Sequence, residues 1–170
     1  MMNSTEPQKI ALEAALSAVP GPRAWSTFRD SLRLNIDAIS LVPTMTRLRE
    51  VGLNMLIDLT AVDLLEYADA TDRYRMVYQL LDTESGARVE VRTHVNDPEP
   101  KLPTMTTLWS SANWMEREAY DMFGIVFTGH PNAKRLLLPD EFASFPLRKD
   151  YPVKGRGERH NFPVVTRSES

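Results

Sequence analysis

Hydrophobic residues recur in the first half of the chain with two different spacings, one typical of helices and the other of strands. Apolar positions repeat at helical spacing over residues 5–18, and Pro20 and Gly21 then end the pattern. Between Leu32 and Asp37 apolar and polar residues alternate, which predicts a strand with one apolar and one solvated face. The same reasoning predicts further strands over residues 24–28, 54–62, 74–81 and 87–95, and a helix over residues 43–51.

The order of these elements predicts an α+β fold. Helices and strands follow one another as α-β-β-α-β-β-β, which is typical of a two-layer domain with helices on one face of a mixed sheet. Residues 54–62 are apolar enough for a strand buried on both faces, although their leucines and methionine would also suit a helix, and residues 96–103 are predicted as a proline-rich loop. We expect residues 1–127, including a short helix at 113–123, to form this domain, and residues 128–170 to form an extended tail that binds a partner.

Local patterns predict how the short helix begins and ends. Asn113 and Glu116 have the spacing of a capping box, in which each side chain binds the backbone N–H of the other residue. Gly124 suits the left-handed conformation that closes a helix. Arg117 and Asp121 lie four positions apart, so we expect their side chains to lie side by side.

Proline and glycine interrupt the sequence beyond this helix. Residues 125–127 have a brief extended pattern, and residues 128–132 are turn formers. No regular element is predicted after Pro139, because further prolines at positions 146, 152 and 163 interrupt any helix or strand ladder. We therefore expect the residues after about position 140 to reach outward and to pack poorly on their own domain.

Composition and charge exclude several kinds of site. The chain has no cysteine, so it cannot form disulfides, thiolate zinc sites or cysteine-ligated iron–sulfur clusters by itself. Its net charge is −3, but residues 146–170 hold six Lys/Arg against three acids, so an acidic body carries a basic tail. The tail lacks the aromatic interleaving of nucleic-acid-binding segments, which favours a protein partner; a merely solvated tail is the alternative. With no secretory signal and no apolar run of membrane-spanning length, we expect a cytoplasmic protein.

Carboxylates and histidines are the candidate catalytic or metal-binding groups. Glu116, Glu118 and Asp121 could act as general acid and base or bind a hard cation. Positions 116 and 118 lie on different sides of a helix, however, so their carboxylates should not converge. The three histidines do not have a recognisable zinc spacing, and no glycine-rich phosphate loop is present. We therefore expect no catalytic residue, cofactor or metal ion in this chain.

Several blocks of the second half occur in a fixed order. They are Glu116-Arg117-Glu118, Tyr120-Asp121-Met122-Phe123-Gly124-Ile125, Gly129-His130-Pro131, Arg135-Leu136-Leu137-Leu138-Pro139-Asp140 and Pro146-Leu147-Arg148-Lys149-Asp150-Tyr151-Pro152. In order and spacing they closely resemble the C-type (30 kDa-type) subunit family of respiratory complex I, NADH:quinone oxidoreductase. A block from Asp58 to Asp63 is also similar, so the resemblance covers roughly residues 55–152. It departs from the family at Phe142 and Ser144-Phe145, where the family commonly has a tryptophan followed by a glycine-histidine pair.

The resemblance implies a non-catalytic structural subunit of the hydrophilic arm of a proton-pumping complex. Such a protein is expected to dock chiefly on the D-type subunit of complex I, and also on the B-type and I-type subunits, and to support electron transfer to quinone. The complex is expected to use NADH, FMN, iron–sulfur clusters and quinone, with none of them bound by this chain. It would lie on the cytoplasmic side of the inner membrane as a peripheral protein, with membrane contact only through the complex and no nucleic-acid partner.

The resemblance also marks fifteen residues, called here the signature residues, as a partner interface. They are Glu116, Arg117, Glu118, Asp121, Phe123, Gly124, His130, Pro131, Arg135, Pro139, Leu147, Arg148, Lys149, Asp150 and Tyr151. Among them Arg117, Arg135, Arg148 and Asp150 are expected to act as assembly contacts, because a guanidinium can bind a carboxylate with two hydrogen bonds.

Two alternatives stay open. The chain could be the equivalent subunit of a related NAD(P)H or ferredoxin:plastoquinone oxidoreductase or of a membrane-bound hydrogenase. It could also be a stand-alone enzyme that uses the carboxylates and the histidine between Glu116 and His130.

Overall fold

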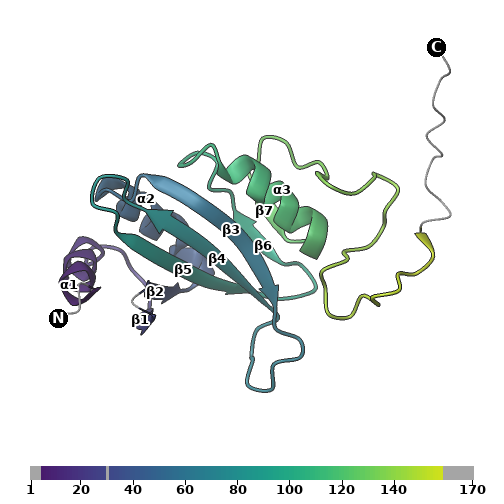
Figure 1. Cartoon of the computed structure of the whole chain (residues 1–170), viewed down its shortest axis with the longest axis horizontal. Helices are drawn as coiled ribbons and strands as arrows, with labels where there is room; N and C mark the ends of the chain where they lie inside the picture. Colours follow the sequence, from purple (N-terminus) through teal and green to yellow (C-terminus); the bar gives the residue numbers. More distant parts are fainter. Residues whose placement is uncertain (1–4, 30, 159–170) are drawn as a thin grey trace, which may run out of the picture.

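A five-stranded sheet with the strand order β1-β2-β5-β4-β3 lies at the centre of the fold (Figure 1). The computed structural model describes residues 5–29 and 31–158. Strands β2 and β5 run parallel and the other neighbours run antiparallel, so the sheet is mixed and the predicted α+β class is confirmed. The strands are β1 (Arg23–Phe28), β2 (Ser31–Ile36), β3 (Met55–Asp63), β4 (Tyr74–Leu81) and β5 (Arg88–Val95).

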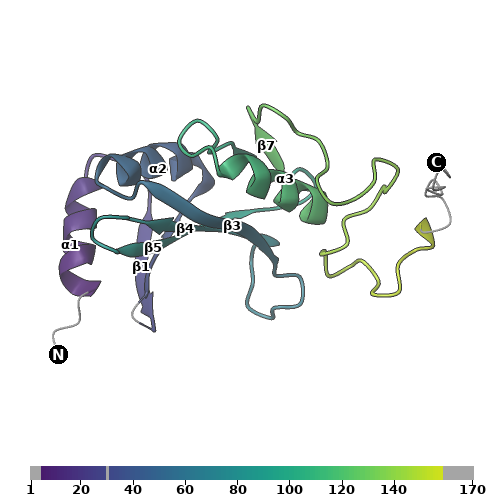
Figure 2. The same cartoon turned by 45° about the horizontal axis from the view of Figure 1, so that its top comes forward.

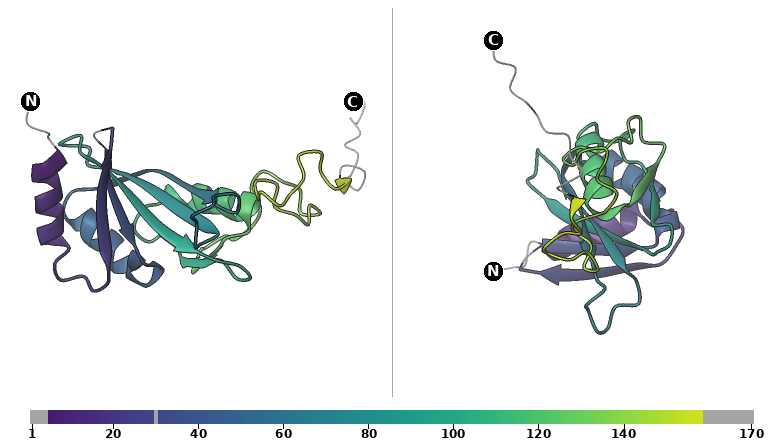
Figure 3. Two further views of the ribbon diagram at one scale, coloured as in Figure 1. Left: turned by 90° about the horizontal axis from the view of Figure 1, so that it is seen from below. Right: turned by 90° about the vertical axis from the view of Figure 1, so that its right-hand side faces the viewer.

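Helices cover one face of this sheet. Helices α2 and α3 lie on the same face (Figure 2), whereas α1 lies beside α2 and β2 at one end of the molecule (Figure 3). Two short strands, β6 and β7, pair in parallel and form a second sheet close to α3. The bounds of these elements are α1 (Thr5–Ala15), the 3-10 turn η1 (Ala38–Ser40), α2 (Leu41–Glu50), β6 (Lys101–Pro103), α3 (Ala112–Phe123) and β7 (Val126–Thr128).

The hydrophobic core lies between the helices and the covered face of the sheet. Alternate residues of β4 are buried because successive side chains of a strand point to opposite faces. The buried members of β4 are Tyr74, Met76, Tyr78 and Leu80; α2 adds Leu41, Met45 and Leu48, and α3 adds Ala112, Ala119, Met122 and Phe123. On the opposite face of the sheet the remaining side chains of β4 are partly exposed.

The structure differs from the sequence predictions at β3, in the loop over residues 96–103 and at the start of α2. Strand β3 is not buried on both faces: Met55 and Ile57 are 47% and 37% exposed, because β3 is an edge strand and the helices cover only one face. The predicted loop over residues 96–103 contains β6, whose partner β7 follows α3 in the chain. Pairing between segments so far apart in the sequence leaves no local pattern. Helix α2 starts at Leu41, with Pro43 in its first turn, where a missing N–H is tolerated.

Residues 129–158, called here the C-terminal segment, follow β7. As far as residue 157 the described chain forms only turns and bends, in agreement with the prediction that no regular element follows Pro139. The first part of the segment lies beside α3, and the later part extends away from the sheet at the end opposite α1 (Figures 1 and 3). The rest of the predicted tail, residues 159–170, lies outside the described residues.

Candidate functional site

The start of α3 differs from the predicted capping box. Its N-cap is Ser111, and the side chain of Ser111 makes no capping hydrogen bond. Glu116 is fully buried instead: its Oε1 accepts a 2.6 Å hydrogen bond from the N–H of Met105, and its Oε2 accepts one of 2.6 Å from Oγ1 of Thr104. The capping box with Asn113 is therefore wrong, because the loop before α3 offers Glu116 two donors in the core.

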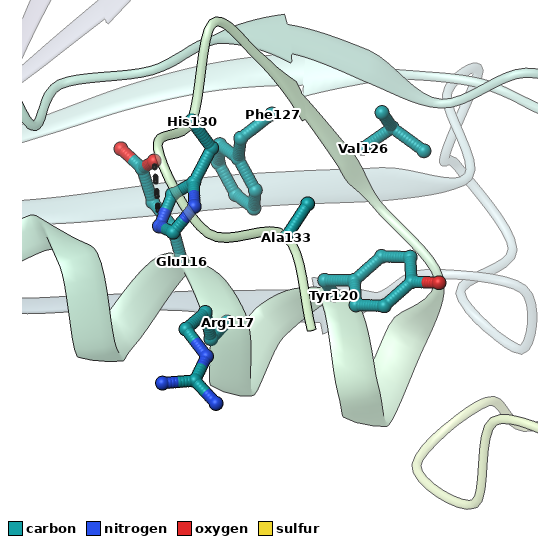
Figure 4. A pocket seen from close by; sticks show the side chains of 7 residues that line it. All are labelled: Glu116, Arg117, Tyr120, Val126, Phe127, His130 and Ala133. Carbon is teal, nitrogen blue, oxygen red and sulfur yellow. Dashed lines mark ion pairs between the residues drawn. The ribbon is translucent and has the colours of Figure 1, made fainter. Parts of the chain in front are cut away.

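Glu116 and His130 meet in a pocket of about 220 Å³ (Figure 4). Nε2 of His130 lies 4.0 Å from Oε2 of Glu116, and both side chains are almost completely buried. The N–H of Asn132 donates to Nδ1 of His130 at 3.0 Å, which leaves the ring proton on Nε2, 3.0 Å from the carbonyl oxygen of Asn113. The residues that line the pocket are Glu116, Arg117, Tyr120, Val126, Phe127, His130 and Ala133.

The carboxyl group of Glu116 has a higher pKa than an ordinary glutamate. Burial raises the pKa of Glu116 to about 7, although the hydrogen bonds from Thr104 and Met105 act in the opposite direction. The folded chain therefore binds the proton of this group more tightly than the unfolded chain does, so ionisation of Glu116 opposes folding.

We expect the contribution of Glu116 to the free energy of unfolding to fall by about 3 kcal/mol between about pH 4.5 and pH 7. In this range the unfolded glutamate has already lost its proton, whereas the folded one still holds it. Glu116→Gln should remove this dependence and make the chain more stable than the wild type at pH 8, as measured by urea unfolding. Glu118→Gln, on the exposed side of α3, is the control. A pH profile that Glu116→Gln leaves unchanged would contradict the assignment.

Asp121 holds the C-terminal segment on α3. It is fully buried, and its Oδ1 lies 2.6 Å from Nη1 of Arg135. Its Oδ2 accepts hydrogen bonds of 3.0, 2.7 and 2.9 Å from the N–H groups of residues 136, 137 and 138. Burial acts to raise the pKa of Asp121, but the bonds from these N–H groups and from Arg135 together hold it below its usual range. The carboxylate thus organises one turn of backbone around itself.

The predicted pair of Arg117 and Asp121 is not formed. Arg117 donates from Nε to the carbonyl oxygen of Lys134 and from Nη2 to that of Arg135, at 2.9 Å each. Its guanidinium also lies 5.0 Å from the centre of the Trp114 ring. An exposed pair at this helical spacing contributes only about 0.3–0.5 kcal/mol. The four donors that Asp121 finds in the C-terminal segment therefore outweigh it.

The end of α3 confirms the prediction for Gly124. This residue has φ 76° and ψ 21°, in the left-handed region. A Cβ atom on it would lie 2.6 Å from a ring carbon of Phe145 and 2.7 Å from Nη2 of Arg148. The guanidinium of Arg148 lies 4.6 Å from the centre of the Phe145 ring and 5.4 Å from that of Tyr74. Glycine is needed here both for its backbone conformation and for the close approach of the C-terminal segment.

The C-terminal segment also binds the last carbonyl groups of α3. Nε of Arg148 donates to the carbonyl oxygen of Phe123 at 2.6 Å, and the N–H of Leu147 donates to that of Met122 at 3.1 Å. The last carbonyls of a helix have no partner within it, and a positive charge is favourable at that end. Residues 147–148 therefore pack on the domain, in contrast to the expectation that the chain after position 140 packs poorly on it.

A cluster around Arg73 ties the next two residues to the sheet. Arg73 lies 2.7 Å from Asp97, 2.8 Å from Asp150 and 3.3 Å from Asp63. The backbone N–H of Lys149 donates to Oδ2 of Asp63 at 2.8 Å. Burial acts to raise the pKa of Asp150, but the hydrogen bond and the charge of Arg73 hold it below its usual range. The end of β3 and the start of β4 are thus joined to the C-terminal segment.

The remaining signature residues divide into buried and exposed groups. Phe123 is buried in the core, and Tyr151 donates from its hydroxyl to Oε2 of Glu158 at 3.1 Å. Glu118, Pro131, Pro139, Leu147 and Lys149 are exposed. Glu116 and Glu118 therefore face in different directions, as their spacing predicted.

The structure also brings in residues that the sequence did not single out. Asp63 ends the Asp58–Asp63 block of the resemblance, so its place in a site could have been suspected. Arg73 and Asp97 belong to no block. The predicted role of the four assembly residues stays a prediction, but Arg117, Arg135, Arg148 and Asp150 each have a partner within the chain.

Two kinds of feature are absent from the part of the chain that the structure describes. No group of three or more His, Cys, Asp or Glu side chains is placed to hold a metal ion there. In the same residues no helix has the length and apolar character needed to cross a lipid bilayer.

Comparisons of the sequence with known proteins agree with the resemblance. The chain is 44% identical to NADH-quinone oxidoreductase subunit 5 of Thermus thermophilus, over 64% of this chain and 56% of the relative. It is 43% identical to the C-type NADH-quinone oxidoreductase subunit of Moorella thermoacetica, over 73% of this chain and 82% of the relative. To the corresponding C-type protein of Burkholderia mallei it is 38% identical, over 98% of this chain and 86% of the relative. The chain thus spans little more than half the length of the Thermus protein and most of the other two.

Comparisons with solved structures support the same fold. A trypsin-resistant fragment of Nqo5, residues 1–134, has a TM-score of 0.65 and 35% identity, and the match covers 74% of this chain and 98% of the fragment. A chain of the membrane-bound sulfane sulfur reductase, an archaeal respiratory membrane complex, has a TM-score of 0.77 over 97% of this chain and 96% of its own length. At 20% identity this second likeness concerns the fold alone.

The family model described as "Respiratory-chain NADH dehydrogenase, 30 Kd subunit" matches residues 34–157, a range that contains most of the sheet, α3 and nearly all of the described C-terminal segment. Together with the relatives in Moorella and Burkholderia, this match shows that the chain belongs to the 30 kDa-type, or C-type, subunit family of respiratory-chain NADH dehydrogenases.

Proposed function

We propose that this chain is a non-catalytic structural subunit of the hydrophilic arm of a proton-pumping NADH:quinone oxidoreductase, and that its C-terminal segment docks chiefly on the D-type subunit and also on the B-type and I-type subunits. One observation carries the proposal. Asp121 of α3 binds the C-terminal segment, and Arg148 of that segment binds the end of α3, whereas Leu137, Leu147 and Val153 in the same segment are 63%, 51% and 105% exposed.

The conformation of the C-terminal segment supports a role in binding. A segment without helix or strand normally loses much conformational freedom when it binds a partner. Here Asp121 and the end of α3 already hold its backbone in one arrangement. Docking then costs less conformational entropy, so an irregular surface can bind specifically.

In this proposal the redox chemistry takes place in the other subunits. NADH, FMN, the iron–sulfur clusters and quinone are bound there, on the cytoplasmic side of the inner membrane, and this chain supports electron transfer by holding those subunits together. The names of the relatives, which are NADH-quinone oxidoreductase subunits, support such a complex. The stability of the trypsin-resistant Nqo5 fragment supports a protease-resistant domain in this chain as well.

Leu147→Glu should reduce incorporation of the chain into the parent complex at least tenfold, because it places a charge in an apolar contact that is then desolvated. Leu147 is half exposed, and the substitution keeps the hydrogen bond that its backbone N–H donates to α3, so the melting temperature of the isolated chain should stay within about 2 °C. Incorporation is measured by the amount of tagged chain in the purified complex, and quinone reductase activity should fall in proportion.

The matched control is Ile39→Glu, since Ile39 is 94% exposed on η1, outside the C-terminal segment. It should assemble normally. Normal assembly of Leu147→Glu, or equal loss in both variants, would reject the C-terminal segment as the docking surface.

A further inference from the structure

The pocket beside Glu116 has walls made mainly of carbon atoms. Tyr120 lies on α3, Val126 and Phe127 on β7, and Ala133 on the loop that follows β7 (Figure 4). Its volume is about 220 Å³. Apolar cavities of about 150 Å³ hold a benzene molecule. The pocket is therefore large enough for the side chain of a leucine, a methionine or a phenylalanine.

Three polar side chains at the pocket, those of Glu116, Arg117 and His130, already have partners within the protein. Both ring nitrogens of His130 make hydrogen bonds, and both carboxyl oxygens of Glu116 accept one. Arg117 directs its guanidinium toward two backbone carbonyl groups and the ring of Trp114. A polar ligand would have to compete for groups that already have partners, whereas an apolar group would not. An apolar occupant is therefore favoured.

Hydrogen bonds on both sides of Ala133 keep the pocket open. Before it, His130 is bound to the carbonyl oxygen of Asn113 on α3. After it, Arg117 of α3 binds the carbonyl groups of residues 134 and 135. The loop is therefore fixed at two points and cannot close onto the helix without losing these bonds. A preformed, mostly apolar concavity is typical of a binding site.

The surroundings of the pocket indicate a protein rather than a free small molecule. Trp114, whose ring lies against Arg117, is 60% exposed, and Val126 in the pocket wall is 39% exposed. The loop that forms one wall continues directly into residues 136–138 of the proposed docking surface, where Leu137 is 63% exposed. Protein interfaces commonly place one anchor side chain in such a pocket, with further contacts around it.

We infer that this pocket is the receptor for one apolar side chain of the neighbouring protein in the complex, which inserts between α3, β7 and the loop 129–134. The inference rests on the proposed function, which it makes more specific: the C-terminal segment supplies the extended contact, and the pocket supplies the anchor point. Partner binding then removes the pocket from water, so that small reagents no longer reach Ala133.

The absence of cysteine from the chain allows a direct test. Ala133→Cys introduces a unique thiol at the pocket, and Ala70→Cys introduces one on the exposed loop between β3 and β4. Each full-length variant is treated with methyl methanethiosulfonate, alone and in the purified complex, and its labelling rate is followed by mass spectrometry. The rate at position 133 should fall at least tenfold on assembly, while that at position 70 should not change. An equal rate at position 133 in both states would overturn the inference.

A second pair of variants tests whether the pocket must be empty for docking. Ala133→Trp, which fills the pocket with the chain's own side chain, should reduce incorporation into the complex at least tenfold; Ala70→Trp should not. If Ala133→Trp assembles normally while Leu147→Glu fails, the proposed function stands and the pocket inference is wrong. Slow labelling of Ala133→Cys in the isolated chain would mean that residues 159–170 or a second copy occupy the pocket, which would also overturn it.

Discussion

Asp121→Ala should destabilise the chain by about 3 to 5 kcal/mol, because it removes a buried carboxylate that compensates one guanidinium and three backbone N–H groups. For a chain of this length such a loss corresponds to a fall in melting temperature of roughly 10 °C. Calorimetry measures that change. Trypsin should also cut after Lys134 and Arg135 well before it degrades the sheet, because residues 134–138 lose their anchor on α3.

Two further variants separate the charge of Asp121 from its hydrogen bonds. Asp121→Asn keeps one acceptor oxygen and loses the charge, so it should be less destabilised than Asp121→Ala. Glu118→Ala changes an exposed carboxylate on the same helix and should alter the melting temperature by less than about 2 °C. If Asp121→Ala melts at the wild-type temperature, the hydrogen bonds around this carboxylate do not organise the C-terminal segment.

Gly124→Ala should destabilise the chain by about 2 to 4 kcal/mol, through two effects that can be measured apart. The left-handed φ of 76° is unfavourable for a residue with a Cβ atom by about 1 to 2 kcal/mol. The new methyl group would also lie 2.6 Å from the ring of Phe145 and 2.7 Å from Nη2 of Arg148, so residues 145–148 must move away from α3. Chemical unfolding gives the total.

Gly86 provides the matched control, since it has a similar φ of 74° and no atom within 4 Å of a Cβ placed on it. Gly86→Ala therefore measures the cost of the backbone conformation alone. The additional loss of stability in Gly124→Ala, compared with Gly86→Ala, measures the cost of displacing residues 145–148. Only Gly124→Ala should impair incorporation into the complex. Equal losses in the two variants would show that the contact with Phe145 and Arg148 is easily relieved.

The strands of the sheet could be predicted from the sequence because the apolar and polar residues within each strand indicate which of its side chains are buried. Residues 32–37 alternate between apolar and polar side chains, and the strand predicted over residues 74–81 has the bounds of β4. The error at β3 has a different origin: an apolar run cannot reveal that its strand lies at an edge. Strand β6 was missed because its pairing with β7 depends on segments on either side of α3.

The contacts of Glu116 and Asp121 were not predicted from the sequence. Local spacing paired Asn113 with Glu116 and Arg117 with Asp121, and each of these pairs would contribute no more than about 1 kcal/mol. The tertiary structure provides more hydrogen bonds than these local pairs would. Glu116 accepts from two donors of the preceding loop, and Asp121 accepts from four donors of the C-terminal segment. No local pattern reveals such partners, so only the three-dimensional structure shows these contacts, and the role of the signature residues as a partner interface stays a prediction.

The hydrogen bond between Asp63 and the backbone of Lys149 joins residues that are 86 positions apart. Because a ribosome releases the N-terminal part of a chain first, β3 and α3 can form before the residues that bind them have been made. A chain interrupted before Leu147 leaves Asp63 without the N–H of Lys149, Arg73 without Asp150, and the last carbonyl groups of α3 without Leu147 and Arg148. These residues of the proposed docking surface are therefore completed last, and we expect a chain that ends before them to fail to join the complex.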